Sequence, residues 1–450
     1  MQKKAIQRRR TQSPSGTKTM NTPSLSPVFL PEELMAVLLS FLTVKHLIKM
    51  KCVSKSWNSL ISDPRFIKMH LDRSARKPYL ALLSMHHKRV ITVPVSRLLH
   101  NPPFTIAADP SYSWDIMYVG SFVGSCNGLL CVNYHAYMKS GKSSLHFYNP
   151  ATRILSNKFW YSNENRKNMY PMERYTFGYD SSSDTYKVVM YGLFFDSKTK
   201  LNGTRVRVFS LGDNVWRDIE DITVAVINHD VYFSGSVNWL ALENCFNQPW
   251  NYDSKCFTLS QFVIVSLDFG TETYTRVLLP QGFDEVPHLE PAICVLMNNL
   301  CFCHDFKKTD FVIWQMKELG VEESWIKLLT ISYQNLQLIS WLPLHLSEDN
   351  NTLIMANNQD EHATIYNLRD GRVDRIITSR AGWAHSKNHV ESLVSICWKV
   401  SFDLTNYYFE FMLICVYMLC NISCDYFHIM WFVWWMIIYW ILSMVLLSLD

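Results

Sequence analysis

Leucines recur at helical spacing near the start of the chain. Leu34, Leu38, Leu39 and Leu42 fall on one face of a helix with 3.6 residues per turn. The segment Leu30-Pro31-Glu32-Glu33 has the composition of a helix start. Proline in the first turn loses no hydrogen bond, and carboxylates favour the positive end of the helix dipole. The pattern therefore predicts a helix with one strongly apolar face.

Two further short helices are predicted directly after the first. Apolar residues at helical spacing mark one at 47–53 and another at 57–61, which ends at Asp63-Pro64 because the residue before proline avoids helical geometry. Three short helices bury too little surface to be stable alone. Leucines left exposed on them therefore predict a docking surface for a partner. The apolar residues of the second and third helices are Leu47, Met50, Val53, Trp57, Leu60 and Ile61.

From about Tyr79 the pattern changes to short apolar or alternating runs separated by Gly, Asn, Asp and Ser, which predicts strands and turns. Several segments share one shape, an apolar strand followed by a polar turn and an aromatic or β-branched return. They recur about every 50 to 60 residues, close to the period of kelch-type propeller blades. We therefore expect a β-propeller, with a β-sandwich as the competing architecture. These segments begin at Leu145, Val206, Phe262, Phe311 and Ala363.

The last stretch, residues 396–450, departs from the strand pattern. Residues 429–449 form an uncharged run of about 20 residues, long enough for a helix to span a bilayer. Residues 411–424 form a second apolar patch that is too short for an ordinary span. Two interpretations stay open: a membrane anchor at the tail, or a translated segment that results from an incorrect gene model.

Composition narrows the class of function. The formal net charge of +4 is small for 450 residues, so no nucleic-acid partner is predicted. Residues 1–26 are polar and basic and bury too little apolar surface to fold, which predicts a disordered tail. The same stretch contains no apolar signal segment, so the twelve cysteines are expected to be reduced and the protein to act in the cytoplasm or nucleus. The alternative location is a membrane, through the 429–449 run.

No catalytic or metal-binding arrangement stands out. Cys301 and Cys303 are separated by one residue, which is tight for zinc, and no second ligand pair lies at finger spacing. We therefore predict no catalytic residue, no metal and no cofactor. Four tryptophans at strand positions are interpreted as blade core rather than as a ligand-binding rim: Trp216, Trp239, Trp314 and Trp325.

The helical segment resembles an F-box, the docking module of SCF-type ubiquitin ligases. Two positions depart from the pattern: Thr43 stands where proline is common, and Met50 where an aromatic residue is common. The matching residues are Leu30-Pro31, Glu33-Leu34, Leu38-Leu39, Leu42, Val44-Lys45, Leu47, Lys51-Cys52-Val53-Ser54-Lys55, Trp57, Leu60-Ile61, Pro64 and Phe66.

The β-rich region resembles the F-box-associated domain of the large plant F-box families. The residues that carry this resemblance are Gly124-Ser125-Cys126-Asn127-Gly128-Leu129-Leu130, Tyr148-Asn149-Pro150-Ala151-Thr152, Phe177-Gly178-Tyr179-Asp180, Tyr186-Lys187-Val188-Val189, Gly235-Ser236-Val237-Asn238-Trp239-Leu240 and, at the end of the domain, Glu391-Ser392-Leu393-Val394-Ser395.

Together these observations predict an α+β multidomain chain: a small three-helix F-box, a β-rich and propeller-like domain, and an apolar tail. The expected divisions are a disordered basic tail at 1–26, the F-box at 27–76, a connecting segment at 77–118, the F-box-associated domain at 119–395 and the apolar tail at 396–450.

The resemblance implies a non-catalytic adaptor that directs ubiquitination and degradation of a protein substrate. Its partners would be a Skp-type adaptor and, through it, a cullin scaffold. Loops at 163–174 and 244–255 are candidate substrate contacts. The alternative is a tail-anchored, propeller-like binding protein that acts at a membrane without ligase function. The expected adaptor-binding residues are Leu30, Pro31, Leu34, Leu38 and Leu42, and the expected F-box core residues are Leu47, Val53, Trp57 and Leu60.

Overall fold

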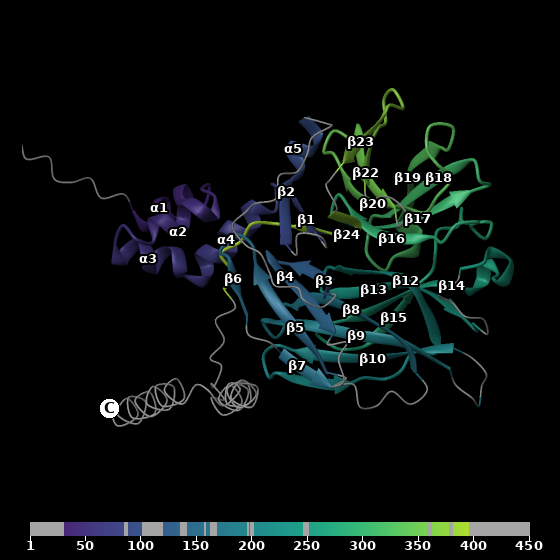
Figure 1. The fold of residues 1–450 in the computed structure, drawn as a ribbon, viewed down its shortest axis with the longest axis horizontal. Helices are drawn as coiled ribbons and strands as arrows, with labels where there is room; N and C mark the ends of the chain where they lie inside the picture. Colours follow the sequence, from purple (N-terminus) through teal and green to yellow (C-terminus); the bar gives the residue numbers. More distant parts are fainter. Residues whose placement is uncertain are drawn as a thin grey trace, which may run out of the picture. The chain divides into compact units, whose positions relative to one another are not determined.

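The computed structural model begins, in its described part, with four helices (Figure 1). They are α1 (Glu32–Leu39), α2 (Val44–Met50), α3 (Lys55–Ser62) and α4 (Pro64–Ser74). The residues that the structure describes are 31–84, 89–100, 120–135, 142–156, 159–162, 169–195, 198, 202–245, 252–357, 362–377 and 381–395. The predicted basic tail at 1–26 and the apolar tail at 396–450 lie outside them.

The fourth helix corrects the prediction of three. Asp63 does end α3, with an extended backbone conformation. However, its side chain also accepts a hydrogen bond from the backbone N–H of Arg65, at 2.7 Å, and so caps the start of α4. Pro64 occupies the first turn of α4, where its missing N–H costs nothing. The dipeptide that ends one helix therefore begins the next.

The helices pack around a small apolar core. Two residues from distant parts of the chain belong to this cluster: Leu393, which is buried, and Ala151, which packs against it. The helical core is therefore completed by residues of the β domain. The buried helical members are Leu39, Val44, Leu47, Ile61 and Phe66.

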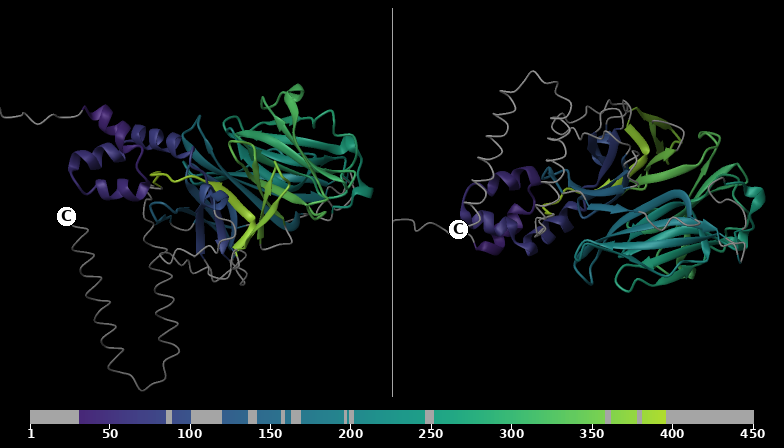
Figure 2. Two further views of the ribbon diagram at one scale, coloured as in Figure 1. Left: turned by 90° about the horizontal axis from the view of Figure 1, so that it is seen from above. Right: turned by 60° about the horizontal axis from the view of Figure 1, so that its bottom comes forward.

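In the described part of the chain the strands form six sheets. Figures 1 and 2 show them side by side in three views. The sheets are, in the order of their strands, β2 (Arg89–Pro94), β1 (Tyr79–Ser84) and β24 (Ala381–His389); β3 (Gly120–Cys126), β4 (Leu129–His135), β5 (Lys142–Asn149) and β6 (Ile154–Leu155), with β7 (Phe159–Ser162) also on β5; β11 (Val215–Asp218), β10 (Asn202–Ser210), β9 (Thr185–Phe195) and β8 (Met169–Asp180); β12 (Val224–Phe233), β13 (Ser236–Glu243), β14 (Phe262–Asp268) and β15 (Tyr274–Val277); β16 (Ala292–Leu296), β17 (Asn299–Phe306), β18 (Asp310–Met316) and β19 (Trp325–Ser332); β20 (Trp341–Leu346), β21 (Thr352–Asn357), β22 (His362–Asn367) and β23 (Val373–Ile377).

The six sheets close into a ring. One edge strand of each sheet contacts its neighbours, in the order β24, β3, β8, β12, β16, β20 and back to β24. Radially repeated antiparallel sheets of this kind define a β-propeller. The propeller prediction is therefore confirmed, with six blades, and the competing β-sandwich is wrong.

The first blade joins the two ends of the domain. β1 pairs antiparallel with β24, so that Tyr79 lies opposite His389. The segment at 77–118, predicted as a connection, therefore supplies two blade strands and the short helix α5 (Val95–His100). Its role in a blade was missed because the strand that completes the blade, β24, lies at the far end of the domain.

Short 3-10 helices lie in the connections of the later blades. They are η1 (Ser254–Cys256), η2 (Leu259–Gln261) and η3 (Glu322–Ser324). Among the residues that the structure describes, no helix is both long enough and apolar enough to span a membrane. The 429–449 run lies outside that part of the chain.

Candidate functional site

The exposed face of α1 carries a row of large apolar side chains. Leu34, Val37 and Leu38 are 52%, 37% and 58% exposed, and Phe41, just after the helix, is 66% exposed. Their spacing of three, four and seven residues places them on neighbouring turns of one face. Pro31, at the start of α1, is exposed as well. An apolar row of this kind on a small domain is the mark of a docking surface.

The opposite face of α1 holds the helix against the rest of the domain. Leu39 is buried in the helical core, and Leu42 packs against it. The four leucines that were predicted to share one face of the helix therefore lie in two environments. Leu34 and Leu38 face outward, whereas Leu39 and Leu42 face inward. Leu42, predicted as part of the docking surface, is half-buried and packs on the core. Leu30 lies outside the described residues.

The α4 helix fixes the end of this apolar row. The guanidinium of Arg73 lies 4.0 Å from the centre of the Phe41 ring, a cation–π arrangement. The same side chain donates a hydrogen bond to the carbonyl oxygen of Val37 at 3.1 Å. Arg73 therefore links α4 to the carboxyl end of α1 and orients Phe41 at the surface.

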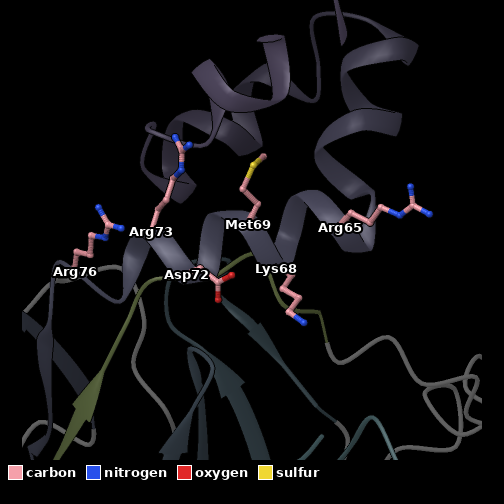
Figure 3. A pocket seen from close by; sticks show the side chains of 6 residues that line it. All are labelled: Arg65, Lys68, Met69, Asp72, Arg73 and Arg76. Carbon is pink, nitrogen blue, oxygen red and sulfur yellow. The ribbon is translucent and has the colours of Figure 1, made fainter. Parts of the chain in front are cut away.

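Beside this contact α4 lines a pocket rich in positive charge (Figure 3). Figure 3 shows Arg73 and Met69 directed towards the neighbouring helices, whereas Lys68 and Arg65 point away from them. The pocket lining contains four basic residues and one acidic residue, so it attracts acidic groups. The lining residues are Arg65, Lys68, Met69, Asp72, Arg73 and Arg76.

Buried His70 stabilises the arrangement of helices. Its Nε2 lies 2.9 Å from the carbonyl oxygen of Leu42, which accepts a hydrogen bond from the ring N–H. Burial lowers the pKa of His70, although the Leu42 hydrogen bond and the charge of Glu391 act in the opposite direction. The ring is therefore neutral near pH 7 and serves structure. The sequence analysis missed it because α4 was not predicted.

The four residues predicted as F-box core differ in burial. Leu47 is buried, and Trp57 and Leu60 pack against the cluster. Val53 is 63% exposed and is not a core residue. It lies in the turn between α2 and α3, where its backbone N–H donates to the carbonyl oxygen of Met50. The turn breaks the helical spacing that linked Val53 to Leu47 and Met50, so its side chain points to solvent.

In the propeller, the cysteine–histidine segment of β17 is divided between two faces. Cys303 packs against Cys294, with the sulfur atoms 3.7 Å apart, whereas His304 stacks on Phe302. Neighbouring residues of a strand point to opposite faces of the sheet. Within the described ranges no group of three or more His, Cys, Asp or Glu residues is arranged to hold a metal ion.

The strand tryptophans lie in the packing of the blades. Trp239 is fully buried, and Trp314 and Trp325 are nearly so, while Trp216 is half-buried. The interpretation as blade core is therefore confirmed for three of the four. In the two candidate recognition loops, residues 163–168 and 246–251 lie outside the described residues, and residues 169–174, predicted as part of the first loop, belong to β8 instead.

Comparison with known proteins identifies both parts of the chain. The model of the F-box domain matches residues 29–69. The model of the F-box associated beta propeller domain matches residues 82–396, most of the chain. Its start at residue 82 agrees with the blade strands found ahead of the predicted boundary.

Curated relatives from Arabidopsis thaliana cover most of the chain. The F-box/kelch-repeat protein At3g23880 is 26% identical over 82% of this chain and 96% of its own length. F-box protein CPR1 is 26% identical over 70% of this chain and 77% of its own length. The putative F-box protein At3g17480 is 23% identical over 84% of this chain and its whole length.

Proposed function

Because the chain belongs to the plant F-box proteins that carry an F-box associated β-propeller domain, we propose that it is the substrate-recognition adaptor of an SCF-type ubiquitin ligase. The F-box helices dock onto a Skp-type adaptor, which links them to a cullin scaffold. The propeller holds a protein substrate. The chain itself contributes no catalytic residue.

The observation that carries this proposal is the outward row on α1. Leu34, Leu38 and Phe41 remain exposed although the same helix buries Leu39 against a core. Complete burial of a fully exposed leucine contributes about 1.5–3 kcal/mol, and because Leu34 and Leu38 are 52% and 58% exposed, each contributes roughly half of that when a partner covers it. A docking surface built this way binds without altering the fold of the helices.

The proposed mechanism is proximity. A substrate held by the propeller is presented at high effective concentration to a ubiquitin-loaded enzyme recruited by the scaffold. Rate then depends on the distance and orientation between substrate and enzyme, and the chain sets both through the way its two domains are joined.

The test is the affinity of the protein for a purified Skp-type adaptor, measured by titration calorimetry. The double variant Leu34→Ser/Leu38→Ser should bind about 10- to 100-fold more weakly, from the two lost leucine contacts. The matched control is Leu319→Ser/Leu338→Ser, which alters two exposed leucines of the propeller, each 40% exposed. It should bind like the unchanged protein.

Two results would contradict the proposal. One is an unchanged protein that is folded, by its thermal unfolding transition, yet does not bind the adaptor. The other is a double α1 variant that binds as tightly as the control, which would place the docking surface elsewhere.

A further inference from the structure

The chain continues past the last blade strand and returns to the helices. Residues 390–395 follow β24 without forming a strand. Figures 1 and 2 show this end of the described chain, in yellow, running from β24 towards the helices. Three motifs that the sequence analysis noted separately meet along it, around Gly128, Asn149 and Leu393.

Asn149 holds the segment to the second blade. Its Nδ2 donates hydrogen bonds to the carbonyl oxygens of Ser392, at 3.0 Å, and Val394, at 2.8 Å. The side chain of Asn149 is fully buried, and its hydrogen bond to Ser392 is buried with it, while the bond to Val394 is partly buried. Loss of the first would leave the buried carbonyl of Ser392 without this partner.

Equivalent turns in other blades show that the amide nitrogen of Asn149 is not needed for the turn itself. The Oδ1 of Asn149 closes the turn after β5 by accepting from the N–H groups of Ala151 and Thr152. After β14 the same position is Asp268, whose Oδ1 accepts from Gly270 and Thr271. An acceptor is therefore sufficient for the turn, and the donor at position 149 serves residues 390–395.

Gly128 provides the space that the segment occupies. The turns at Asn127-Gly128 and Ser234-Gly235 have matching conformations, with φ of +50° and +80° in each. A Cβ at Gly128 would lie 2.4 Å from Cβ of Ser392, whereas a Cβ at Gly235 would meet nothing within 4 Å. The two glycines thus share a backbone conformation and differ in their neighbours.

The same turn in another blade accepts a side chain. Between β16 and β17 the turn is Met297-Asn298, with φ of +48° and +57°. A residue with a Cβ is therefore compatible with this kind of turn where space allows. Position 128 lacks a side chain because residues 390–395 pass close to its backbone.

On its other side the segment enters the F-box. Leu393 is buried in the helical cluster, and Ala151, two residues after Asn149, packs against the same cluster. One short segment is thus hydrogen-bonded to a blade through its backbone and buried among the helices through its side chain.

We propose that residues 390–395 are a brace that fixes the F-box against the propeller. A role for the brace in ubiquitin transfer rests on the proposed ligase function. In that ligase Asn149, Gly128 and Leu393 are positioning residues, because they set where a bound substrate lies relative to the ubiquitin-loaded enzyme. Small misplacements of reacting groups reduce rate strongly. The brace itself does not depend on the ligase role.

The first test uses Asn149→Asp. Aspartate keeps the Oδ1 acceptor of the turn but directs an oxygen at the carbonyls of Ser392 and Val394, so the brace is released. The matched control is Asn367→Asp, at the equivalent turn after β22, where Oδ1 of Asn367 accepts from the N–H of Arg369. Pulsed EPR measures the distance between spin labels on noncanonical residues at the exposed positions Ser59 and Glu323.

The expected result is one narrow distance distribution for the unchanged protein and for Asn367→Asp, and a broad distribution for Asn149→Asp. A narrow, unshifted distribution in folded Asn149→Asp would overturn the brace. If that variant does not fold, the pair Gly128→Ala and Gly235→Ala asks the same question, since both carry equal backbone strain and only the first meets the segment.

The second test concerns positioning. Each variant is assembled with a Skp-type adaptor, a cullin scaffold and a ubiquitin-loaded enzyme, and the chain's own modified lysines are identified by mass spectrometry. Asn149→Asp should bind the adaptor as tightly as the control but spread modification over more lysines. An unchanged lysine set overturns the positioning role. Failure of the unchanged protein to bind the adaptor overturns the proposed function and leaves the distance result standing.

Discussion

Several aromatic side chains of the propeller and one of the F-box, Phe41, have opposite environments, although Phe66 of the F-box is buried as well. Trp239, Trp383 and Phe302 are fully buried between strands of the propeller, whereas Phe41 in the F-box is 66% exposed. Six large exposed apolar residues lie among the helices of residues 31–74, and the much longer described part of the propeller has nine. The F-box ones are Leu34, Val37, Leu38, Phe41, Ile48 and Val53.

The difference follows from the size of the two cores. A ring of sheets buries apolar residues between neighbouring blades, so strand side chains find partners within the chain. A unit of four short helices has too little interior to cover all its leucines. It completes its core by taking Leu393 from the other domain. The propeller therefore buries its aromatic residues within its own sheets, whereas the F-box core draws on a residue from outside its helices.

The largest expected effect comes from removing a propeller aromatic. Trp239 is fully buried, and its ring lies 5.4 Å from that of Tyr191 in the neighbouring sheet. Trp239→Ala should lower the free energy of unfolding by about 3–5 kcal/mol, because a large cavity replaces packed atoms. Chemical denaturation monitored by circular dichroism measures this loss.

Phe41→Ala is the counterpart in the F-box. Its ring is mostly exposed, and it loses chiefly the contact with Arg73, which contributes about 0.5–1 kcal/mol. A cost for Phe41→Ala as large as that for Trp239→Ala would remove the distinction between a docking surface and a core.

The helical period predicted three of the four N-terminal helices, and the recurring strand segments predicted the propeller, whereas the F-box was identified by its resemblance to a known family. The first blade required information from far along the chain. β1 and β2 form a blade only because β24 completes it, some 300 residues later, as the register of Tyr79 opposite His389 shows. The polar sequence of β24 gives little strand signal of its own.

The next effect in size compares buried histidines of the two domains. Burial lowers the pKa of His389, on β24, to about 3. A lowered folded-state pKa means that protonation favours the unfolded chain, so stability is complete above the ordinary value near 6.5 and is lost as pH falls below it. At pH 5 the loss from His389 alone is about 2 kcal/mol.

His389→Gln should therefore reduce the loss of stability between pH 7.5 and pH 5 by about 2 kcal/mol, as measured by denaturant unfolding at each pH. The F-box control is His70→Gln, with a smaller effect expected because the hydrogen bond to Leu42 partly offsets burial. Equal pH dependence in the unchanged protein and His389→Gln would contradict the assignment of His389 as a buried neutral group.

The exposed apolar residues of α1 were only partly predictable for a related reason. Periodicity shows which residues share a face of a helix, but it does not show whether that face packs on the core or lies exposed. A leucine suits either environment. Leu38 and Leu39 are adjacent and have opposite roles. The brace was not predictable at all, because Asn149 and Leu393 are distant in sequence. In addition, Asn149 and Asn367 both stand at turns that follow a blade strand, so nothing in the sequence sets Asn149 apart.

The smallest expected effect is at Val53, the residue that spacing wrongly assigned to the F-box core. Its side chain is 63% exposed in the turn between α2 and α3. Val53→Ser should change the free energy of unfolding by less than about 0.5 kcal/mol, the usual range for surface substitutions. Leu47→Ala, in the buried core of the same helices, should cost about 2–5 kcal/mol and serves as the control. Hydrogen exchange of the α2 and α3 amides separates the two, because only loss of the core increases exchange throughout both helices. If Val53→Ser instead increases that exchange as much as Leu47→Ala, Val53 is part of the core of the helices.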